Sequence, residues 1–522
     1  MRITSSCVIG VAAVLAAPAA RASVTDQPNI LVIVLDDVGP DKIPSYGGDF
    51  AGYAPLYRPN TQTVDSLATA GLRFTRAWAT PMCSSTRASL QTGQQPFRTG
   101  IGTALGNDAV GLDPTRFLNL ADSFASRGYA TGLFGKYHIG TENAAGVVGF
   151  PPPMFVVQPH PALMGWQRFF GSYDGYLGTD PLDPDDGYFK WNRVSWLNSG
   201  TGFAATENNG VHATDRTAGV ALDWITSRTQ PWLAMVTFNA GHSGTSASTT
   251  WTAADVNKDP AAYRTAALSC LANSPVTCAD EKRQSYQALV EHADIAIRTL
   301  LDGIAPATLD NTMIFVFGDN GTPIAVEESL FNVPNRGKGS TYENGVRVPL
   351  IVAEGKAWRT GVAGTRIPVI NRTVVAKVNT LDIFNTLHNV AFALSVAFID
   401  SMPFTQCFTV NDIYCGFPGK RYGYTETYPL SGVADATTKI AVSYGEDTLV
   451  GCYKPAPNNC MKEAFYDTST DPLETAPQAW VGLRANRLRD YFTTLHTGLV
   501  TWANPTGAAV IPFCGAAVAA CP

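Results

Sequence analysis

Four residues with oxygen-bearing side chains stand in two pairs that are far apart in the chain. Asp36 and Asp37 form one pair, Asp319 and Asn320 form the other, and each pair closely follows an apolar run of strand length. Converging carboxylates repel one another, and a bound divalent cation removes that repulsion. Because every donor is an oxygen, the set favours calcium or magnesium over zinc or copper. Turns also favour Asp and Asn, so neither pair is evidence by itself.

A cysteine with an arginine four residues later is the second candidate for chemistry. Cys83 and Arg87 lie in the segment CSSTRASLQTG. A thiol is a poor partner for a hard, oxygen-liganded cation. Cys83 is therefore either a buried structural residue or one whose sulfur is removed before it acts. On a helix, Arg87 would lie one turn away and could stabilise an oxyanion near position 83.

The apolar runs indicate the elements that position these residues. Runs 29–35, 232–238 and 312–317 are apolar without alternation, which is typical of strands buried on both faces. Apolar residues repeat at helical spacing over 286–301 and predict a helix of about four turns. Alternating strands and helices indicate an α/β fold with a mainly parallel sheet, whose ligands bind at the carboxyl ends of the strands. The two oxygen-rich pairs and the segment around His242 would then converge at one edge.

The chain divides into four segments by composition. We expect a signal peptide over 1–22, a catalytic α/β domain over 23–395, a small C-terminal α+β domain over 396–500 and a tail over 501–522. In the third segment, short strand-like pieces separated by turns predict an antiparallel sheet. These pieces are 422–427, 439–444, 448–453 and 464–467.

The N-terminal segment has the features of an export signal. Arg2 precedes an uncharged stretch, and Ala20-Arg21-Ala22 matches a small-residue cleavage site. The expected cleavage follows Ala22, and the expected location is secreted or periplasmic. No later run reaches the length of a transmembrane helix, so we expect no membrane span.

The cysteine spacing agrees with an oxidising compartment. Apart from Cys7 and Cys83, the cysteines fall into close neighbours: Cys270/Cys278, Cys407/Cys415, Cys452/Cys460 and Cys514/Cys521. Four local disulfides and one free cysteine are the simplest interpretation. A zinc site is the alternative, but neither a C-x2-C motif nor clustered histidines accompany them.

Composition excludes other classes of protein. The 522 residues are 45% hydrophobic and 15% charged, with a net charge of −6. Disordered chains have fewer apolar residues and more net charge. No basic run appears, so nucleic acid is not an expected partner.

Four ordered motifs carry a resemblance to a known family. NILVIVLDDVG, CSSTRASLQTG, GKYHIG and GKGSTYENGVRVP occur in the order and approximate spacing of the type I sulfatases, over roughly residues 28–390. The resemblance implies an alkaline-phosphatase-like fold, in which a large mixed sheet lies between helices beside a small C-terminal antiparallel sheet. It also implies hydrolysis of an aryl or carbohydrate sulfate monoester.

The resemblance further implies roles for particular residues. Cys83 would be oxidised by the formylglycine-generating machinery to Cα-formylglycine, whose hydrate is the nucleophile. A calcium ion, or magnesium, would be bound by Asp36, Asp37, Asp319 and Asn320. An oxygen of the residue formed from Cys83 would complete the set of ligands. Residues matching the positions that hold the hydrate and the sulfate are Arg87, Lys136 and His138. His242 and Lys338 match a pair that contacts sulfate and helps the leaving group to depart.

One departure from the family pattern leaves alternatives open. The family's maturation motif has Pro, or sometimes Ala, two positions after the cysteine, where this chain has Ser85. We expect conversion because Cys83 and Arg87 are kept. One alternative function is hydrolysis of a phosphonate monoester or phosphodiester on the same scaffold. The other is a non-catalytic protein that has lost maturation.

Overall fold

The computed structural model describes most of the chain from residue 27 to residue 467. The described residues are 27–49, 58–106, 109, 111–140, 154–156, 160–178, 187–197, 202–243, 281–327, 336–397, 399–416, 422–427, 438–444, 447–454 and 460–467. The expected signal peptide and C-terminal tail lie outside them. Within the described part, no helix is long and apolar enough to cross a membrane.

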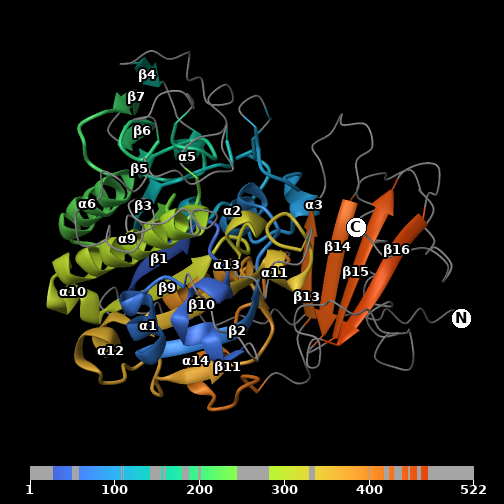
Figure 1. The fold of residues 1–522 in the computed structure, drawn as a ribbon. Helices are drawn as coiled ribbons and strands as arrows, with labels where there is room; N and C mark the ends of the chain where they lie inside the picture. Colours follow the sequence, from blue (N-terminus) through green and yellow to red (C-terminus); the bar gives the residue numbers. More distant parts are fainter. Residues whose placement is uncertain are drawn as a thin grey trace, which may run out of the picture.

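A 12-stranded mixed sheet is the main element of the molecule (Figure 1). Its centre is parallel and runs in the order β9 (Thr312–Gly318), β1 (Asn29–Leu35), β8 (Trp232–Phe238), β3 (Ala130–Gly135) and β5 (Arg168–Gly171). Antiparallel pairs flank this centre. Beyond β9 lie β10 (Arg347–Glu354) and β2 (Gly71–Trp78), and the short strands β11 (Arg372–Val374) and β12 (Val378–Asn379) each pair with β2 in parallel. Beyond β5 lie β6 (Trp191–Leu197), β7 (Gly202–Glu207) and β4 (Met154–Val156).

The apolar run of β1 explains why helices cover both faces of the sheet. Alternate residues of a strand point to opposite faces, and here both sets are buried. Ile30, Val32 and Val34 belong to one core cluster, and Leu31, Ile33 and Leu35 belong to the other. The first cluster includes side chains of α2 (Cys83–Thr92), α4 (Leu120–Ala125) and α13 (Asp382–Phe392). The second includes side chains of α1 (Gln62–Thr69), α6 (Ala213–Thr226), α9 (Glu281–Gly303) and α10 (Pro306–Asp310).

Helix α9 is longer than its apolar pattern predicts. We expected about four turns over 286–301, whereas the helix has 23 residues. The extension is mainly at the N-terminal end, where the polar residues Glu281, Lys282 and Arg283 carry no apolar repeat. Short helices complete the described set: α3 (Pro96–Thr99), α5 (His160–Leu163), α11 (Glu343–Val346), α12 (Gly355–Thr360), α14 (Gln406–Thr409), and the 3-10 turns Pro40–Lys42, Pro44–Asp49 and Ile324–Val326.

A separate four-stranded antiparallel sheet lies beside the large one (Figure 1). Its order is β13 (Tyr422–Thr427), β14 (Thr438–Tyr444), β15 (Asp447–Lys454) and β16 (Cys460–Asp467). All four strands occur where the sequence predicts them, and β16 begins earlier than expected. Strand β13 joins the two parts, because the Thr425 hydroxyl donates to the carbonyl of Ala79 at 3.0 Å.

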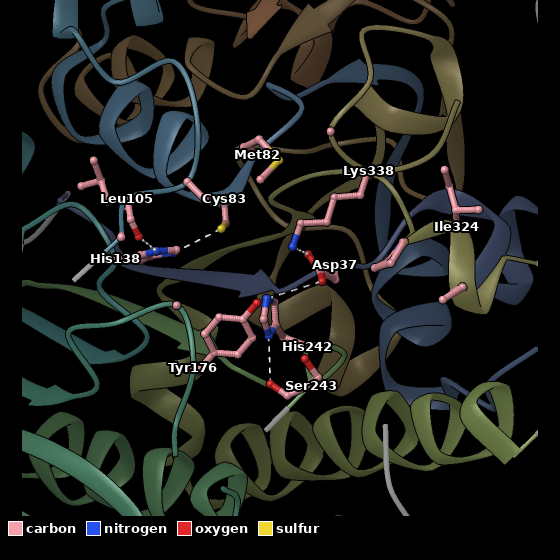
Figure 2. Close-up of a pocket in the computed structure, with 16 residues that line it drawn as sticks. Asp37, Met82, Cys83, Leu105, His138, Tyr176, His242, Ser243, Ile324 and Lys338 are labelled. Carbon is pink, nitrogen blue, oxygen red and sulfur yellow. Dashed lines mark hydrogen bonds and ion pairs between the residues drawn. The ribbon is translucent and has the colours of Figure 1, made fainter. Parts of the chain in front are cut away.

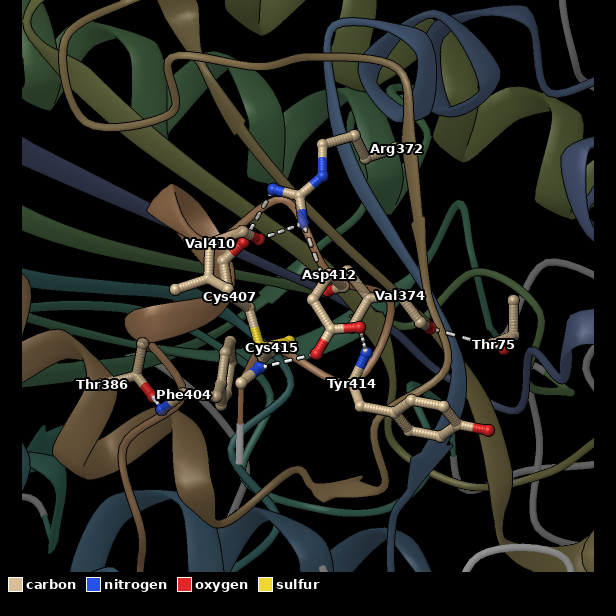
Figure 3. Close-up of a disulfide and its surroundings, with 11 residues drawn as sticks. Thr75, Arg372, Val374, Thr386, Phe404, Cys407, Val410, Asp412, Tyr414 and Cys415 are labelled. Carbon is tan, nitrogen blue, oxygen red and sulfur yellow. Dashed lines mark hydrogen bonds between the residues drawn. A yellow bond between two sulfur atoms is a disulfide. The ribbon is translucent and has the colours of Figure 1, made fainter. Parts of the chain in front are cut away.

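One of the four expected disulfides lies among the fully described residues and is present. Cys407 and Cys415 are bonded, with 4.5 Å between their Cα atoms (Figure 3). Arg372 donates to the carbonyl of Cys407 at 3.0 Å and so ties this loop to β11. Cys83 is a free, buried thiol, as expected. The neighbours 270/278 and 514/521, and the side chains of Cys452 and Cys460, lie outside the described residues.

Candidate active site

The parallel pairing of β1 with β9 brings the two oxygen-rich pairs together. In the register of these strands Leu35 is opposite Gly318, so Asp36 and Asp319 emerge side by side at the carboxyl edge. The backbone N–H of Asp319 donates to the carbonyl of Leu35 at 3.1 Å. The N–H of Asp37 in turn donates to Oδ1 of Asp319 at 3.1 Å. The two loops therefore meet as one cluster, although 282 positions separate Asp37 from Asp319.

Two residues of this edge have unusual backbone conformations. Asp37 has a φ of 63° and His138 a φ of 52°, in the left-handed region that non-glycine residues seldom adopt. Such conformations persist where the surroundings fix them, and they concentrate at functional sites. Here the Asp37 N–H is held by Asp319, and the carbonyl of Asp37 accepts from the Tyr286 hydroxyl at 2.8 Å.

Three cations face the three buried carboxylates; Arg87 and Lys136 are buried, and Lys338 is partly exposed. Arg87 Nη2 lies 2.7 Å from Oδ2 of Asp319 and 3.5 Å from Oδ2 of Asp36. Lys136 Nζ lies 2.5 Å from Oδ2 of Asp36. Lys338 forms an ion pair with Asp37 (Figure 2). A buried charge is tolerated when it is paired, so the described cluster carries balanced formal charges.

Burial and neighbouring charges shift the pKa values of Asp319 and Lys338. Burial raises the pKa of the Asp319 carboxyl, and Asp36 adds to that effect while Arg87 opposes it. Burial alone would lower the pKa of Lys338, but the Asp37 carboxylate raises it above its ordinary value. The charged form of Asp319 is thus favoured by Arg87, and the charged form of Lys338 is favoured by Asp37.

The donor set fits a cation with oxygen ligands. Oδ1 of Asp36 and Oδ1 of Asn320 are buried and have no hydrogen-bond partner among the described residues. Asn320 instead uses its amide nitrogen, which donates to Oδ1 of Asp37 at 2.8 Å. Unpartnered buried oxygens are costly unless an ion or water satisfies them. Asp36, Asp37 and His242 also present possible ligand atoms within 4.8 Å of one another.

Cys83 begins helix α2 and faces a histidine. Its sulfur lies 3.2 Å from Nδ1 of His138, and its side chain is buried. The other ring nitrogen, Nε2, is 2.9 Å from the carbonyl of Leu105. Because a carbonyl only accepts, Nε2 carries the proton and Nδ1 of neutral His138 presents a lone pair to residue 83. Burial lowers the pKa of His138 well below its ordinary value, with Lys136 adding to the effect, which favours this neutral form.

Ser85, the departure from the family motif, takes part in a hydroxyl network at the start of α2. Its Oγ donates to the carbonyl of Met82 at 2.8 Å and lies 2.6 Å from Oγ1 of Thr80. Thr80 Oγ1 is also 2.7 Å from the hydroxyl of Thr86. The network fixes the turn that leads into Cys83. One turn into the helix, Arg87 reaches both Asp319 and the carbonyl of Lys136, at 2.7 Å each.

His242 follows β8 and faces the same cluster from another side. Its Nδ1 lies 2.9 Å from the carbonyl of Ser243, so Nδ1 carries a proton. Its Nε2 lies 3.8 Å from Oδ2 of Asp37. The ring of Tyr176 packs edge-on against the His242 ring, with 4.8 Å between the centroids. Burial lowers the pKa of His242, and Lys136 and Lys338 lower it further.

A cavity of about 560 Å³ opens onto these residues (Figure 2). Residue 83, His138, His242, Asp37 and Lys338 all line it. Its remaining walls are mostly apolar or glycine and include side chains that our sequence analysis did not single out. They are Met82, Ala104, Leu105, Gly106, Gly175, Tyr176, Ser243, Pro323, Ile324, Ala325 and Gly339.

The structure therefore gathers the candidate residues in one place. All ten positions named from the sequence lie in this cluster or directly contact a residue that does. The wall residues were missed because single apolar residues in loops form no periodic pattern. Tyr176 had no distinguishing signal, since its role depends on where the loop after β5 folds back. The fold and the cluster together define an α/β protein with a possible metal-binding group of side chains beside a free, buried cysteine.

Comparison with known proteins places this architecture in a family. The model of the family described as Sulfatase matches residues 28–391. That is 364 of 522 residues, and the chain belongs to the sulfatase family.

Several characterised relatives share parts of the sequence. Human arylsulfatase A is 35% identical over 160 residues, which cover 30% of this chain and 27% of that protein. Human N-acetylgalactosamine-6-sulfatase is 27% identical over 360 residues, covering 64% of this chain and 57% of that protein. The matches thus span from about a quarter to somewhat over half of these relatives.

Solved structures share the fold over nearly the whole chain. The protein BT4656, solved in complex with its substrate D-glucosamine-2-N,6-O-disulfate, has a TM-score of 0.61 at 17% identity and covers 91% of this chain and 98% of its own. The PsFucS1 sulfatase from Pseudoalteromonas has a TM-score of 0.58 at 17% identity and covers 92% of each chain. These likenesses confirm the expected alkaline-phosphatase-like architecture with a small second sheet.

Proposed function

We propose that the protein is a secreted sulfatase that hydrolyses an aryl or carbohydrate sulfate monoester to an alcohol and sulfate. The observation that carries the proposal is the contact of Cys83 with His138 beside three carboxylates at the carboxyl edge of the sheet. Family membership and the names of the relatives support the class of reaction.

In this proposal Cys83 is converted to Cα-formylglycine by the formylglycine-generating machinery. The hydrated aldehyde supplies one hydroxyl as a nucleophile and a second that releases sulfate as the carbonyl re-forms. The Nδ1 lone pair of His138 lies where it can accept a proton from a hydroxyl at residue 83. Burial raises the pKa of the Cys83 thiol, and the positive charge of Lys136 opposes that rise. Arg87 and Lys136 also provide positive charge that can stabilise negative charge developing in the transition state.

The residues that would hold a cation are Asp36, Asp37, Asp319 and Asn320, together with an oxygen of the residue formed from Cys83. Calcium is our first choice and magnesium the second, because all the donors are oxygens. When bound, such an ion supplies positive charge to polarise a sulfuryl oxygen. Lys338 and His242 also line the cavity, and we assign them to the departure of the leaving group.

The cavity walls bear on the substrate. Tyr176, Met82, Leu105 and Ile324 offer apolar surface next to the polar cluster (Figure 2). Such surface suits a flat aromatic ring or the apolar face of a sugar. The glucosamine disulfate bound by BT4656 and the galactosamine named for the human relative are therefore included as candidate substrates.

A substrate panel tests the proposal. Natively produced protein and its Cys83→Ala variant are compared on para-nitrophenyl sulfate, sulfated galactosamine and glucosamine, para-nitrophenyl phosphate, a phosphodiester and a phosphonate monoester. We expect turnover of at least one sulfate ester by the wild type and none by Cys83→Ala. Turnover confined to the phosphorus esters would favour the alternative hydrolase. Equal rates for the two proteins would favour a non-catalytic role for the chain.

The proposed export has its own test. If residues 1–22 are a signal peptide, the N-terminal sequence of protein recovered from outside the cytoplasm begins at Ser23. Protein that retains Met1 in that fraction would contradict the assignment.

A further inference from the structure

Thr322 contacts three segments of the candidate site, although no motif marks it in the sequence. Its hydroxyl accepts from the backbone N–H of Gly39 at 3.0 Å and donates to Oδ1 of Asp41 at 2.6 Å. Its carbonyl accepts from the N–H of Lys338 at 3.1 Å. The side chain is buried, with 1% of the residue exposed.

The Thr322 hydroxyl extends the pairing of β1 with β9 beyond the ends of the strands. Leu35 accepts from the N–H of Asp319, and the N–H of Asp37 donates to the Asp319 side chain. The next alternate residue, Gly39, donates to Thr322. After the strands end, side chains thus accept the hydrogen bonds that backbone carbonyls would accept within a sheet.

The environment of Gly39 shows how closely these groups approach. A Cβ atom at Gly39 would lie 2.7 Å from both Oδ1 of Asp41 and Oγ1 of Thr322. Contacts under 3.0 Å do not occur for real Cβ atoms, and here the neighbours are held by hydrogen bonds. Glycine at this position therefore permits the contact between the two loops.

We infer that Thr322 is a positioning residue for the cation site, and this inference rests on the cation binding in the proposed function. Its hydroxyl holds the loop that carries Asp36 and Asp37 against the loop that carries Asp319 and Asn320. Its carbonyl fixes the backbone of Lys338, which faces Asp37. Partners that orient metal ligands without touching the ion typically change metal affinity about 10–100-fold when they are removed.

Thr386 provides a matched control. It is also buried, its hydroxyl donates to the carbonyl of Asp382 at 2.8 Å, and it accepts from the N–H of Phe404 at 3.1 Å (Figure 3). It lies on α13, among residues that do not line the cavity. Thr322→Val and Thr386→Val thus each remove one donated hydrogen bond and one accepted from a backbone N–H at a buried site.

The experiment measures calcium binding rather than turnover. The full-length protein and its variants are stripped with a chelator, checked for folding by circular dichroism and thermal unfolding, and titrated with calcium in a calorimeter. We expect Thr322→Val to bind calcium about 10–100-fold more weakly than wild type. Thr322→Ser, which keeps the hydroxyl, is expected to bind nearly as tightly as wild type. Thr386→Val should lower thermal stability without changing the affinity.

The outcomes separate this inference from the proposed function. Wild-type affinity in Thr322→Val, or equal weakening in Thr386→Val, overturns the positioning role while leaving the cation site intact. If wild-type protein binds neither calcium nor magnesium, the cation binding in the proposed function is wrong and the inference falls with it. If Thr322→Val does not fold, Asp41→Asn weakens the same hydrogen bond. Weaker calcium binding by that variant is then expected, and unchanged binding overturns the inference.

Discussion

At the scale of single residues, hydrogen-bond partners distinguish the two histidines of the candidate site. His138 donates a hydrogen bond from Nε2–H to the Leu105 carbonyl and presents the lone pair of Nδ1 to residue 83. His242 donates a hydrogen bond from Nδ1–H to the Ser243 carbonyl and presents Nε2 toward Asp37 and the cavity. His138 is therefore placed to accept a proton from residue 83. His242 can donate from Nε2 only when it is protonated, a state that the negative charge of a bound sulfate ester would favour.

Substitution of His242 should affect poor leaving groups most. We expect His242→Ala to lower kcat about 10²–10⁴-fold for an alkyl or sugar sulfate, because general acid catalysis typically contributes that much. The loss for para-nitrophenyl sulfate should be about tenfold or less, since nitrophenolate leaves without a proton. Steady-state rates on the two substrates test this difference. Equal losses on both would contradict a role in leaving-group departure.

Much of the polar cluster could be predicted from the sequence, because its members follow apolar strands or lie in ordered motifs. Asp36, Asp319 and Cys83 are examples, and the structure places them together. Thr322 and Tyr176 could not be predicted. Their positions depend on how loops close after the strands end, and a single threonine or tyrosine in a loop has no periodic signal.

At the scale of elements, uninterrupted apolar runs predicted the central strands, and half-buried strands escaped prediction. β1, β8 and β9 are buried along their whole length. β6 mixes buried, half-buried and exposed residues and lies near one edge of the sheet, so its sequence resembles a loop. Helix α13 packs into the core cluster on one face of the sheet. Its buried histidine, His388, received no role in the sequence analysis.

His388 links α13 to α4 through hydrogen bonds that require the neutral form of its ring. Its Nδ1 lies 2.8 Å from the Phe384 carbonyl, so that nitrogen is the donor. Its Nε2 then accepts from the Ser123 hydroxyl at 2.7 Å, and Arg127 donates to the same hydroxyl at 2.9 Å. Burial lowers the pKa of His388 to about 4, against an ordinary value of 6.5, and Arg127 adds to the shift. The neutral ring is thus the form that the fold requires.

Folding stability should fall as His388 becomes protonated. The unfolded chain takes up this proton near pH 6.5 and the folded chain only near pH 4, so stability is lost as pH falls between those values. The full loss is roughly 3 kcal/mol. Urea unfolding of wild type and His388→Gln at pH 7 and pH 4 tests this. The variant should lose less stability than wild type, and parallel losses would contradict the assignment.

At the scale of the whole molecule, strand β13 joins the small sheet to the large one through buried polar contacts. Glu426 accepts from the backbone N–H of Phe97 at 2.8 Å, and the Thr427 hydroxyl donates to the Gly102 carbonyl at 2.9 Å. Trp78 and Tyr342 of the large part share a core cluster with Ala441 and Val450 of the small sheet. The sequence predicted the small sheet, but its docking depends on contacts between segments more than 300 residues apart.

The carboxyl of Glu426 makes this junction sensitive to pH. Burial raises the pKa of Glu426 to about 8 from an ordinary value of 4.5, although the Phe97 N–H opposes the shift. The folded state therefore keeps a proton that the unfolded chain releases, and stability falls as pH rises from 4.5 to 8. The Glu426→Gln variant has an uncharged side chain at position 426 at every pH. Its thermal midpoint, measured by scanning calorimetry, should exceed that of wild type at pH 8.5 and differ little from it at pH 4.5. A pH-independent difference would contradict this explanation.

The state of residue 83 tests the central claim most directly. Active protein, produced natively and digested, is analysed by mass spectrometry for the peptide that contains Cys83, with Cys83→Ala as the reference. We expect the mass of an aldehyde or its hydrate at position 83 and the loss of thiol-alkylating reactivity. An intact, alkylatable Cys83 in protein that still hydrolyses sulfate esters would contradict the formylglycine mechanism.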